Sequence, residues 1–351
     1  MEQNKVLIAM SGGVDSSVAA YLTIQSGASC VGATMCLHKS DDASSQVEDA
    51  NSVAQRLGIP FYEFDFQEEF RCLVMDSFVR SYESGLTPNP CVECNRCLKF
   101  GRLLQQAQEL GCTHVATGHY ARVIQDPASG RYVLQKAVDE SKDQSYFLYS
   151  LTQEQLSRIL FPLGHLHKSE VREIAQAQGF VTAKKKDSQD ICFVPDGDYR
   201  LFMEHHTGKA YAPGDFLDLN GNVVGRHNGA VGYTLGQRKG LGIAMGEPVY
   251  VCGKDMERNT VTVGPNQALM HRSLRANQWY WHTIPELTEP LRVTAKARSR
   301  MTEQPATVYP EENGFARVEF DEPQRAMTPG QAVVLYDGDI VVGGGTIVEA
   351  F

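Results

Sequence analysis

The sequence lacks any run of about eighteen apolar residues, which is the length that a membrane-spanning helix requires. A secretory signal peptide is missing as well, because Met1 to Lys5 leads directly into a short apolar segment. These absences predict a cytoplasmic protein that has no membrane partner.

An excess of positive charge is also missing, since the formal net charge is −9. This value argues against a generic polyanion binder. It does not exclude RNA, because local patches decide such binding, whereas net charge mainly sets solubility and steering. Basic residues gather at Lys184–Lys186 and again between Arg292 and Arg300. On its own, the lysine triplet is more typical of a solvated loop.

The cysteines do not form the compact, even-numbered set that is typical of a disulfide framework. Nine cysteines stand at positions 30, 36, 72, 91, 94, 97, 112, 192 and 252. In a reducing compartment such residues are expected to be thiols, ligands or catalysts rather than covalent cross-links.

The chain is long enough for two or three domains, with 351 residues of which 42% are hydrophobic and 21% are charged. We predict a nucleotide-binding catalytic domain at residues 1–196 and a central domain that contacts RNA at residues 197–272. A C-terminal β-barrel domain is predicted at residues 273–351.

The first region alternates strand-like and helix-like segments. Runs at 5–10, 30–35, 61–66 and 114–117 predict strands, and the spacing at 47–57, 70–82 and 91–109 predicts helices. This alternation indicates an α/β fold with a parallel sheet. Because ligands of such sheets bind at the carboxyl ends of strands, the segments after Met10, Met35 and Thr117 are expected to share a crevice.

The pattern becomes rich in β-structure after about Gly197. A predicted helix at 199–206 is followed by short strand-like runs bounded by Gly, Asn and Asp. Asn220-Gly221 is typical of a two-residue hairpin turn. The strands of roughly the last eighty residues have the spacing of a β-barrel.

The most informative segment is KVLIAMSGGVDSS, at residues 5–17. A buried strand, a Gly-rich turn and a helix N-terminus in this order form an anion site, because backbone N–H groups and the helix dipole face the ligand. No Lys-Ser/Thr pair follows the loop, so it is not a Walker-type P-loop. A plain helix-capping turn is the simpler interpretation, but it needs one Ser or Asp rather than three hydroxyls, two glycines and an acid together.

A second informative segment is TPNPCVECNRC, at residues 87–97. The prolines hold an extended stretch that leads to the start of a helix, where the dipole favours a thiolate. Cys91 and Cys94 form a CxxC pair, which on spacing alone fits a redox site, a metal site or chance. Cys192 is a distant partner whose preceding lysine triplet is expected to favour its thiolate.

Taken together, these segments resemble the tRNA-specific 2-thiouridylase (MnmA/TrmU) family. The resemblance spans nearly the whole chain. It rests on SGGVDSS (11–17), GLTPNPCVECN (85–95), ATGHYAR (116–122), KDQSYFL (142–148), DSQDICF (187–193), YTLGQRKGLG (233–242), PGQAVVLY (329–336) and GGGTI (343–347).

The resemblance implies a PP-loop ATP-binding domain and ATP-dependent 2-thiolation of the wobble uridine of tRNA. Adenylation of the uracil C2 oxygen would create a leaving group, with Mg²⁺ and the Gly-rich loop stabilising the departing pyrophosphate and Asp15 helping to place the metal. A persulfide on Cys192 would then deliver sulfur, and Cys94 would release it by closing a transient disulfide. The implied partners are tRNA and a persulfide sulfur donor, which is a cysteine desulfurase or a relay protein.

The family motifs assign further residues by position. The ATP-binding positions are Ala9, Met10, Ser11, Gly12, Gly13, Val14, Asp15, Ser16, Met35 and Gly118. The positions that contact the target base are Asn89, Pro90 and Cys91. The positions that contact tRNA are His119, Lys142, Asp143, Gln144, Arg298, Ser299 and Gln331. Taken alone, Lys142 to Gln144 is more typical of an ordinary polar loop.

Cys91 departs from the family pattern, because many members have Asp at this position as a general acid or base. Cys91, Cys94 and Cys192 are also a plausible ligand set for an iron–sulfur cluster whose open iron carries sulfur. Two mechanisms are therefore open, a persulfide relay on Cys192 and a cluster held by all three thiols.

Two functions of other classes are weighed against thiolation. An ATP-dependent ligase or amidotransferase would use the same loop but would give Cys94 and Cys192 no role. A non-catalytic RNA-binding protein would not need the intact loop residues Ser11, Gly12 and Asp15.

Overall fold

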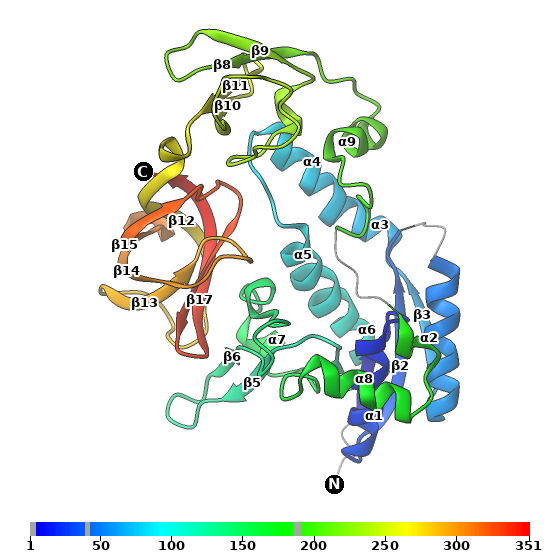
Figure 1. Cartoon of the computed structure of the whole chain (residues 1–351). Helices are drawn as coiled ribbons and strands as arrows, with labels where there is room; N and C mark the ends of the chain where they lie inside the picture. The colour runs from blue at the N-terminus through cyan, green and yellow to red at the C-terminus, as the bar shows by residue number, and fades with distance from the viewer. Residues whose placement is uncertain (1–4, 39–42, 186–190) are drawn as a thin grey trace.

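The computed structural model describes residues 5–38, 43–185 and 191–351. Three sheets carry the fold, and Figure 1 shows them as separate regions around the helices. Within the described residues, no helix has both the length and the apolar character needed to cross a membrane.

The N-terminal sheet is parallel, as predicted. Its strands are β1 (Lys5–Ala9), β2 (Ser29–Cys36), β3 (Phe61–Asp65), β4 (His114–Ala116) and β7 (Ile159–Leu160). Their order in the sheet is β3-β2-β1-β4-β7. The strand order reverses between β1 and β4, so this is the point where an open α/β sheet offers a crevice.

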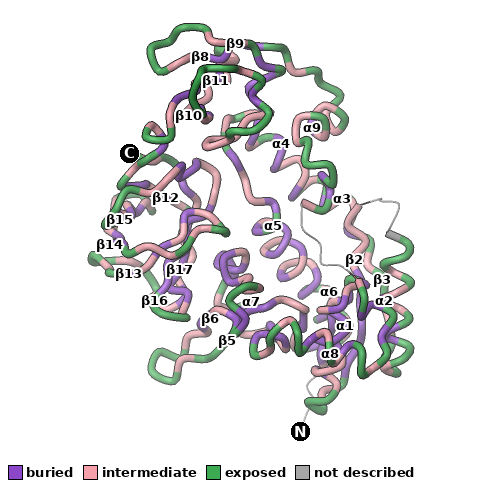
Figure 2. The backbone as a smooth tube through the Cα atoms, viewed as in Figure 1, coloured by how far each residue is buried: buried purple, intermediate pink, exposed green. Residues whose placement is uncertain are grey.

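Helices cover both faces of this sheet. Alternate residues of β1 face opposite ways: Val6 and Ile8 pack in one apolar cluster, and Leu7 packs in another. The first cluster includes residues of α1 (Val14–Gln25), α2 (Ala43–Leu57) and α8 (Lys168–Ala177). The second includes residues of α6 (Leu103–Glu109), and Figure 2 shows the buried backbone concentrated in and around this sheet.

Two long helical stretches change their winding part-way. The first runs through α3 (Gln67–Phe70), a π-helical turn η1 (Arg71–Met75) and α4 (Asp76–Glu83). The second runs through α5 (Pro90–Glu93), the π-helix η2 (Cys94–Arg102) and α6. The predicted helices at 70–82 and 91–109 are therefore confirmed, but their α-helical period is not uniform.

Short elements connect the sheet to the rest of the chain. They are the hairpin β5 (Arg122–Gln125) and β6 (Tyr132–Gln135), η3 (Ser145–Phe147), α7 (Gln153–Leu156) and η4 (Val181–Lys184). The helix α9 (Tyr199–Thr207) then leads away from the parallel sheet.

A second sheet of four strands has the order β10-β11-β8-β9. Its strands are β8 (Gly214–Leu217), β9 (Val223–His227), β10 (Tyr250–Asp255) and β11 (Thr260–Gly264), with η5 (Ala230–Gly232) between β9 and β10. The two-residue turn predicted at Asn220-Gly221 is wrong, because a longer loop joins β8 and β9. The Asp218 carboxylate accepts hydrogen bonds from the N–H groups of Asn220 and Asn222, both at 2.8 Å, which holds the wider loop.

The last region is a closed barrel, which confirms the predicted fold class. Its elements are η6 (Asn266–Leu269), β12 (Met270–Trp281), β13 (Leu291–Lys296), β14 (Gln304–Pro310), η7 (Glu312–Gly314), β15 (Ala316–Arg325), β16 (Ala332–Asp337) and β17 (Ile340–Ala350). The order β12-β15-β14-β13-β16-β17 closes through antiparallel pairing of β12 with β17. The hairpin β5–β6 joins this sheet through Ile340 and Gln135, so the barrel is tied to the N-terminal region.

Candidate functional site

The Gly-rich loop between β1 and α1 is shaped by its backbone. Gly12 has a φ of +68°, and a Cβ there would lie 2.3 Å from the carbonyl oxygen of Gln46 in α2. The hydroxyls of Ser16 and Ser17 donate to the Gly13 carbonyl at 3.1 and 2.9 Å. These two hydroxyls therefore hold the turn itself. No side chain among the described residues caps α1, so the helix presents its first N–H groups to an anion.

The other predicted loop residues have distinct environments. Met10 and Val14 are buried in the core, and Ala9 ends β1 beside them. Ser11 is exposed, and its backbone N–H donates to the Ser16 hydroxyl at 3.1 Å. Of the three predicted hydroxyl donors, the Ser11 side chain is the exposed one.

Asp15 is held by two residues that are distant in the sequence. The Lys168 ammonium group lies 2.7 and 2.8 Å from the two carboxylate oxygens, and the Tyr120 hydroxyl donates to one of them at 2.8 Å. Both carboxylate oxygens of Asp15 therefore have partners within the protein, and its role in placing Mg²⁺ stays a prediction.

The ends of β2 and β4 lie beside this loop, since both strands pair with β1. A Cβ at Gly118 would lie 2.8 Å from the Asp15 carbonyl carbon and from the Ser16 nitrogen. Gly118 therefore lets the end of β4 approach the loop backbone. Met35 is half-buried at the end of β2 and packs against the core on the side of α6.

The cysteine helix begins with an N-cap, as the extended TPNP stretch predicts. The Asn89 side chain accepts a hydrogen bond from the Cys91 N–H at 3.2 Å, and Pro90 occupies the first helical turn. Cys91 is exposed, whereas Cys94 is only 7% exposed. Cys94 packs in the same apolar cluster as Phe193, the residue after Cys192. The structure therefore brings the two distant cysteine segments together.

The environment of the thiols differs from the one predicted. Burial raises the pKa of the Cys192 thiol to about 11, and the charges of Cys94 and Cys91 raise it further. Desolvation by the surrounding protein also raises the pKa of Cys94, which is buried, and of Cys91, although Cys91 and Cys192 are both exposed to solvent in part. These directions run against the expected thiolates, because loss of solvent disfavours the charged form.

The described lysines of the triplet differ: Lys184 is exposed, as expected of a solvated loop, whereas Lys185 has partners. Lys185 donates to the Gly12 carbonyl at 3.1 Å and forms an ion pair with Asp49, so its charge lies at the Gly-rich loop. Lys186 and the stretch 187–190 of the DSQDICF motif lie outside the described residues. Cys192 is the seventh residue after Lys185, so the two lie at most about 25 Å apart.

The three thiols lie close enough for the charges of Cys91 and Cys94 to raise the pKa of Cys192. The described residues contain no group of three His, Cys, Asp or Glu side chains placed to hold a metal ion, and the iron–sulfur mechanism stays a prediction. All nine cysteines of the chain are free thiols.

The barrel contacts the cysteine helix through one loop. The Gln331 side chain donates to the carbonyls of Thr87 and Pro88 at 2.8 and 3.3 Å. The Thr87 N–H donates to the Pro329 carbonyl at 2.9 Å. Gln331 therefore contacts the backbone just ahead of Asn89, the first residue of the segment predicted to contact the target base.

Two other predicted RNA segments meet at the end of β4. Gln144 and Tyr120 exchange hydrogen bonds at 2.9 Å, which places the KDQ loop beside His119. The Asp143 carboxylate accepts from the N–H groups of Ala137 and Ser145, so it organises its own loop. The His119 ring packs near Phe100 and Phe161, and burial lowers its pKa well below the ordinary value. Lys142 is half-buried in the same loop.

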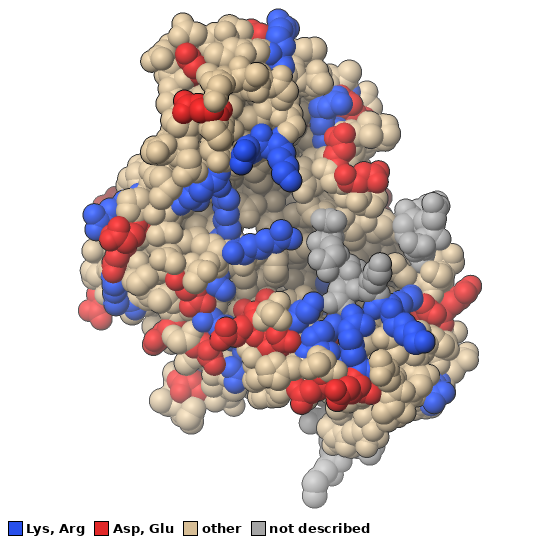
Figure 3. All heavy atoms as spheres, in the orientation of Figure 1, with Lys and Arg blue, Asp and Glu red and all other residues tan. Residues whose placement is uncertain are grey.

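Arg298 and Ser299 lie on the barrel side. The Arg298 guanidinium donates to the Ala326 carbonyl and, at 3.4 Å, to the Thr328 hydroxyl, while Ser299 is exposed. Arg325 donates to the Gly236 carbonyl at 3.2 Å, so the predicted basic loop at 233–242 is close by. Figure 3 shows Lys and Arg side chains around a hollow at the centre of this face.

Comparison with known proteins agrees with this arrangement. The family models "tRNA methyl transferase HUP domain", "tRNA methyl transferase PRC-barrel domain" and "Aminomethyltransferase beta-barrel domain" match residues 4–196, 200–265 and 271–347. A protein of Symbiobacterium thermophilum named tRNA-specific 2-thiouridylase MnmA is 50% identical over 99% of this chain and 92% of its own length. Proteins of the same name from Acetivibrio thermocellus and Clostridioides difficile are each 48% identical over 99% of this chain, and over 100% and 98% of their own lengths.

The chain belongs to the MnmA tRNA-specific 2-thiouridylase family. The resemblance inferred from the sequence motifs is thereby confirmed.

Lys99 is a residue of this MnmA family member that the sequence reasoning missed. Its charge lowers the pKa of Cys91, of Cys94 and of Cys192, and it also lowers the pKa of His119. Lys99 is five residues after Cys94 and lies within η2. In a π-helix, hydrogen bonds join residue i to residue i+5, so residues five apart come to the same side, which an α-helical period does not predict.

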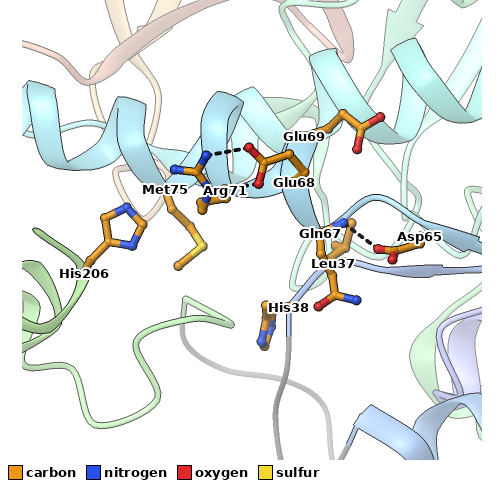
Figure 4. Close-up of a pocket in the computed structure, with 9 residues that line it drawn as sticks. All are labelled: Leu37, His38, Asp65, Gln67, Glu68, Glu69, Arg71, Met75 and His206. Carbon is orange, nitrogen blue, oxygen red and sulfur yellow. Dashed lines mark hydrogen bonds and ion pairs between the residues drawn. The ribbon is translucent and has the colours of Figure 1, made fainter.

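A cavity that the sequence did not predict lies at the ends of β2 and β3, next to η1. Its volume is about 630 Å³. Figure 4 shows its lining, which consists of Leu37, His38, Asp65, Gln67, Glu68, Glu69, Arg71, Met75 and His206. Arg71 and Glu68 are bound to each other at 2.5 Å, and Leu37 also packs against the cluster that contains Cys94.

Proposed function

We propose that this chain catalyses ATP-dependent 2-thiolation of the wobble uridine of tRNA, in the cytoplasm. The observation that carries the proposal is that the two cysteine segments meet in one apolar cluster, which holds Cys94 and Phe193. Leu37, just after β2, packs against this cluster, and β2 pairs with β1, the strand that leads into the Gly-rich loop. The common name of the relatives at 48–50% identity supports tRNA as the substrate.

The first step activates an unreactive carbonyl. The C2 oxygen of the uracil attacks the α-phosphorus of ATP, and the bond to pyrophosphate breaks. The N-terminus of α1 and the backbone of Gly12 and Gly13 are suited to hold the departing pyrophosphate. Mg²⁺ enters as part of the substrate MgATP, and no step is assigned to a metal bound by Asp15.

The second step transfers sulfur. The terminal sulfur of a Cys192 persulfide attacks C2, and AMP departs with the electrons of the C2–O bond. The Cys94 sulfur attacks the Cys192 sulfur, which forms a disulfide and leaves the transferred sulfur on the base. The proton of the Cys94 thiol passes to the phosphate of the departing AMP, because Cys91 is itself a protonated thiol whose pKa is raised. An external thiol then reduces the disulfide, and a persulfide-carrying protein reloads Cys192.

The same arrangement suggests how the base arrives. Asn89, Pro90 and Cys91 form the helix start beneath the barrel loop of Gln331. His119 and the KDQ loop lie at the end of β4. Gly118 in the same segment approaches the Gly-rich loop, and the His119 ring packs near Phe100 of the cysteine helix. A base flipped out of the anticodon is read in such a pocket while the tRNA body is gripped elsewhere by phosphate and shape contacts.

The test is reconstitution with purified protein, unmodified tRNA, ATP and a persulfide donor, followed by mass spectrometry of the tRNA nucleosides. We expect 2-thiouridine with the wild-type protein and none with Cys192→Ser, while ATP–pyrophosphate exchange with tRNA continues. Cys252→Ser is the matched control, because Cys252 lies on β10. Exchange without thiolation in the wild type would favour a ligase or amidotransferase, and absence of both would favour a non-catalytic RNA-binding protein.

Anaerobic purification separates the relay from an iron–sulfur mechanism. We expect colourless, iron-free protein that remains active with a persulfide donor. Broad visible absorption that disappears on replacement of Cys91, Cys94 or Cys192 would overturn the relay.

A further inference from the structure

Lys168 reaches the Gly-rich loop from a part of the chain that no family motif assigned to nucleotide binding. It is the first residue of α8 and lies 153 positions from Asp15 in the sequence. Its ammonium group contacts both carboxylate oxygens of Asp15, at 2.7 and 2.8 Å. Its side chain is only 11% exposed.

The start of α8 is fixed by hydrogen bonds to two acidic residues. The Lys168 N–H donates to the Asp139 carboxylate at 2.9 Å, and the His167 N–H donates to the Glu170 carboxylate at 2.7 Å. The Lys168 ammonium group also lies 5.7 Å from the centre of the Tyr120 ring, whose hydroxyl binds Asp15. Lys168 is thus positioned from several sides before any ligand binds.

The loop combines a helix start with two lysines, each of which is paired with a carboxylate. The first N–H groups of α1 are positive, Lys185 binds the Gly12 carbonyl and pairs with Asp49, and Lys168 pairs with Asp15. Figure 3 shows Lys and Arg side chains gathered over the region of α1 and α8. An ammonium group held by a carboxylate beside a phosphate-type loop binds phosphate as a point charge.

We propose that Lys168 binds the phosphates of ATP and that Asp15 orients Lys168 rather than a metal ion. The inference rests on the use of ATP proposed above. It assigns to Asp15 a positioning role and to Lys168 the contact with substrate. A purely structural pair would instead join α1 to α8 without affecting the ligand.

Calorimetric titration with two ligands distinguishes these roles. ATP carries the phosphates and adenosine does not, so both are titrated in EDTA and again with Mg²⁺. For Lys168→Met we expect ATP affinity in EDTA to fall about 10- to 100-fold, the loss typical of a charge-assisted contact, while adenosine affinity changes less than about twofold. Lys168→Arg keeps the charge and is expected to restore most of the ATP affinity.

Lys5→Met is the matched control. Lys5 lies at the opposite end of β1 and donates to the Leu110 carbonyl at 2.7 Å, so the variant loses the same charge far from the loop. We expect its ATP affinity to equal that of the wild type. Unchanged ATP binding by Lys168→Met, or an equal loss of ATP and adenosine, would overturn the inference.

Asp15→Asn tests the second half of the proposal. If Asp15 orients Lys168, the variant responds to Mg²⁺ as the wild type does, and Asp15→Asn with Lys168→Met is no weaker than Lys168→Met alone. If Asp15 binds the metal, the response to Mg²⁺ is lost and the two effects add, which would overturn the positioning role. Failure of the wild-type protein to bind ATP would overturn the proposed function itself, together with this inference.

Discussion

The two ends of the candidate site differ in how they treat charge. At the Gly-rich loop, Lys168 and Lys185 are bound to partners, and the helix start of α1 adds positive potential. At the sulfur end, Cys94 packs among aromatic and aliphatic side chains, and burial keeps the thiols protonated at neutral pH. The Gly-rich loop therefore favours a bound anion, whereas the surroundings of the cysteines disfavour a thiolate.

This difference fits the two half-reactions. Pyrophosphate leaves with its charge fully developed, so preorganised donors stabilise it without rearrangement. A resting thiolate, in contrast, would be open to oxidation, and in the proposed relay a raised pKa would keep Cys192 unreactive before it is loaded with sulfur. A persulfide is a stronger acid than a thiol, so the loaded group ionises where the bare thiol does not.

Lys99→Met has the largest expected effect on this contrast. The variant removes the charge that lowers the pKa of Cys91, Cys94 and Cys192. Because loss of this charge raises the pKa of the thiol and lowers its thiolate fraction, we expect alkylation of Cys192 by iodoacetamide at pH 8 to slow. The rate of the wild type should rise with pH toward about 11, and that of the variant should need a still higher pH.

The control for Lys99 lies in the same protein. Cys252 has a pKa that is raised mainly by burial and is affected by Arg325 rather than Lys99, so its alkylation should not change. Lys99→Arg keeps the charge and should keep the rate. If Cys192 were alkylated at the same rate in Lys99→Met and in the wild type, Lys99 would not stabilise the Cys192 thiolate.

The sequence predicts the helices, strands and motif residues of the two ends better than it predicts the side chains that surround them. Strand and helix spacing identifies the parallel sheet, because apolar period and Gly or Pro boundaries are local signals. The closure of β12 on β17 and the attachment of the β5–β6 hairpin depend on pairing between distant residues, such as Ile340 with Gln135. Motif position identifies Asp15 and Cys192, but their partners Lys168 and Lys99 depend on tertiary contact and on a π-helix, which no α-helical period indicates.

Arg298→Ala has the next largest expected effect, and it concerns the barrel, which contacts the chain at Thr87 and Pro88 before the cysteine helix. We expect tRNA affinity to fall about five- to tenfold and the slope of log affinity against log salt to decrease by about 1, with ATP affinity unchanged. The guanidinium group also holds the loop at Ala326 and Thr328, which precedes Gln331. A filter-binding series over a range of salt concentrations measures both quantities.

Gln331→Leu separates a phosphate contact from loop positioning. It removes the hydrogen bonds to Thr87 and Pro88 but no charge, so tRNA affinity should fall with an unchanged salt slope. An Arg298→Ala protein with the wild-type salt slope would mean that Arg298 acts only by holding this loop.

The smallest expected effect is on the free energy of unfolding, and it compares Lys254, whose ammonium group is buried without a carboxylate partner among the described residues, with Lys168, which pairs with Asp15. The buried Lys254 ammonium group has no hydrogen-bond partner among the described residues, and it lies 5.7 Å from the centre of the Tyr82 ring in the cluster that contains Cys94. Burial lowers its pKa from 10.5 to about 8. Between these values the unfolded chain binds more protons than the folded one, so stability rises with pH across this range, and the cost of the buried charge is fully present below about pH 8.

Lys254→Met should therefore raise the free energy of unfolding by about 1 kcal/mol at pH 7, after allowance for partial exposure, and the gain should disappear above about pH 10.5. Lys168→Met should have the opposite sign, because it leaves the Asp15 carboxylate without its ion pair. Urea unfolding at pH 7 and at pH 10.5 measures both differences. If both variants were destabilised at pH 7, burial at the sulfur end would not penalise charge, and the contrast between the two ends would be lost.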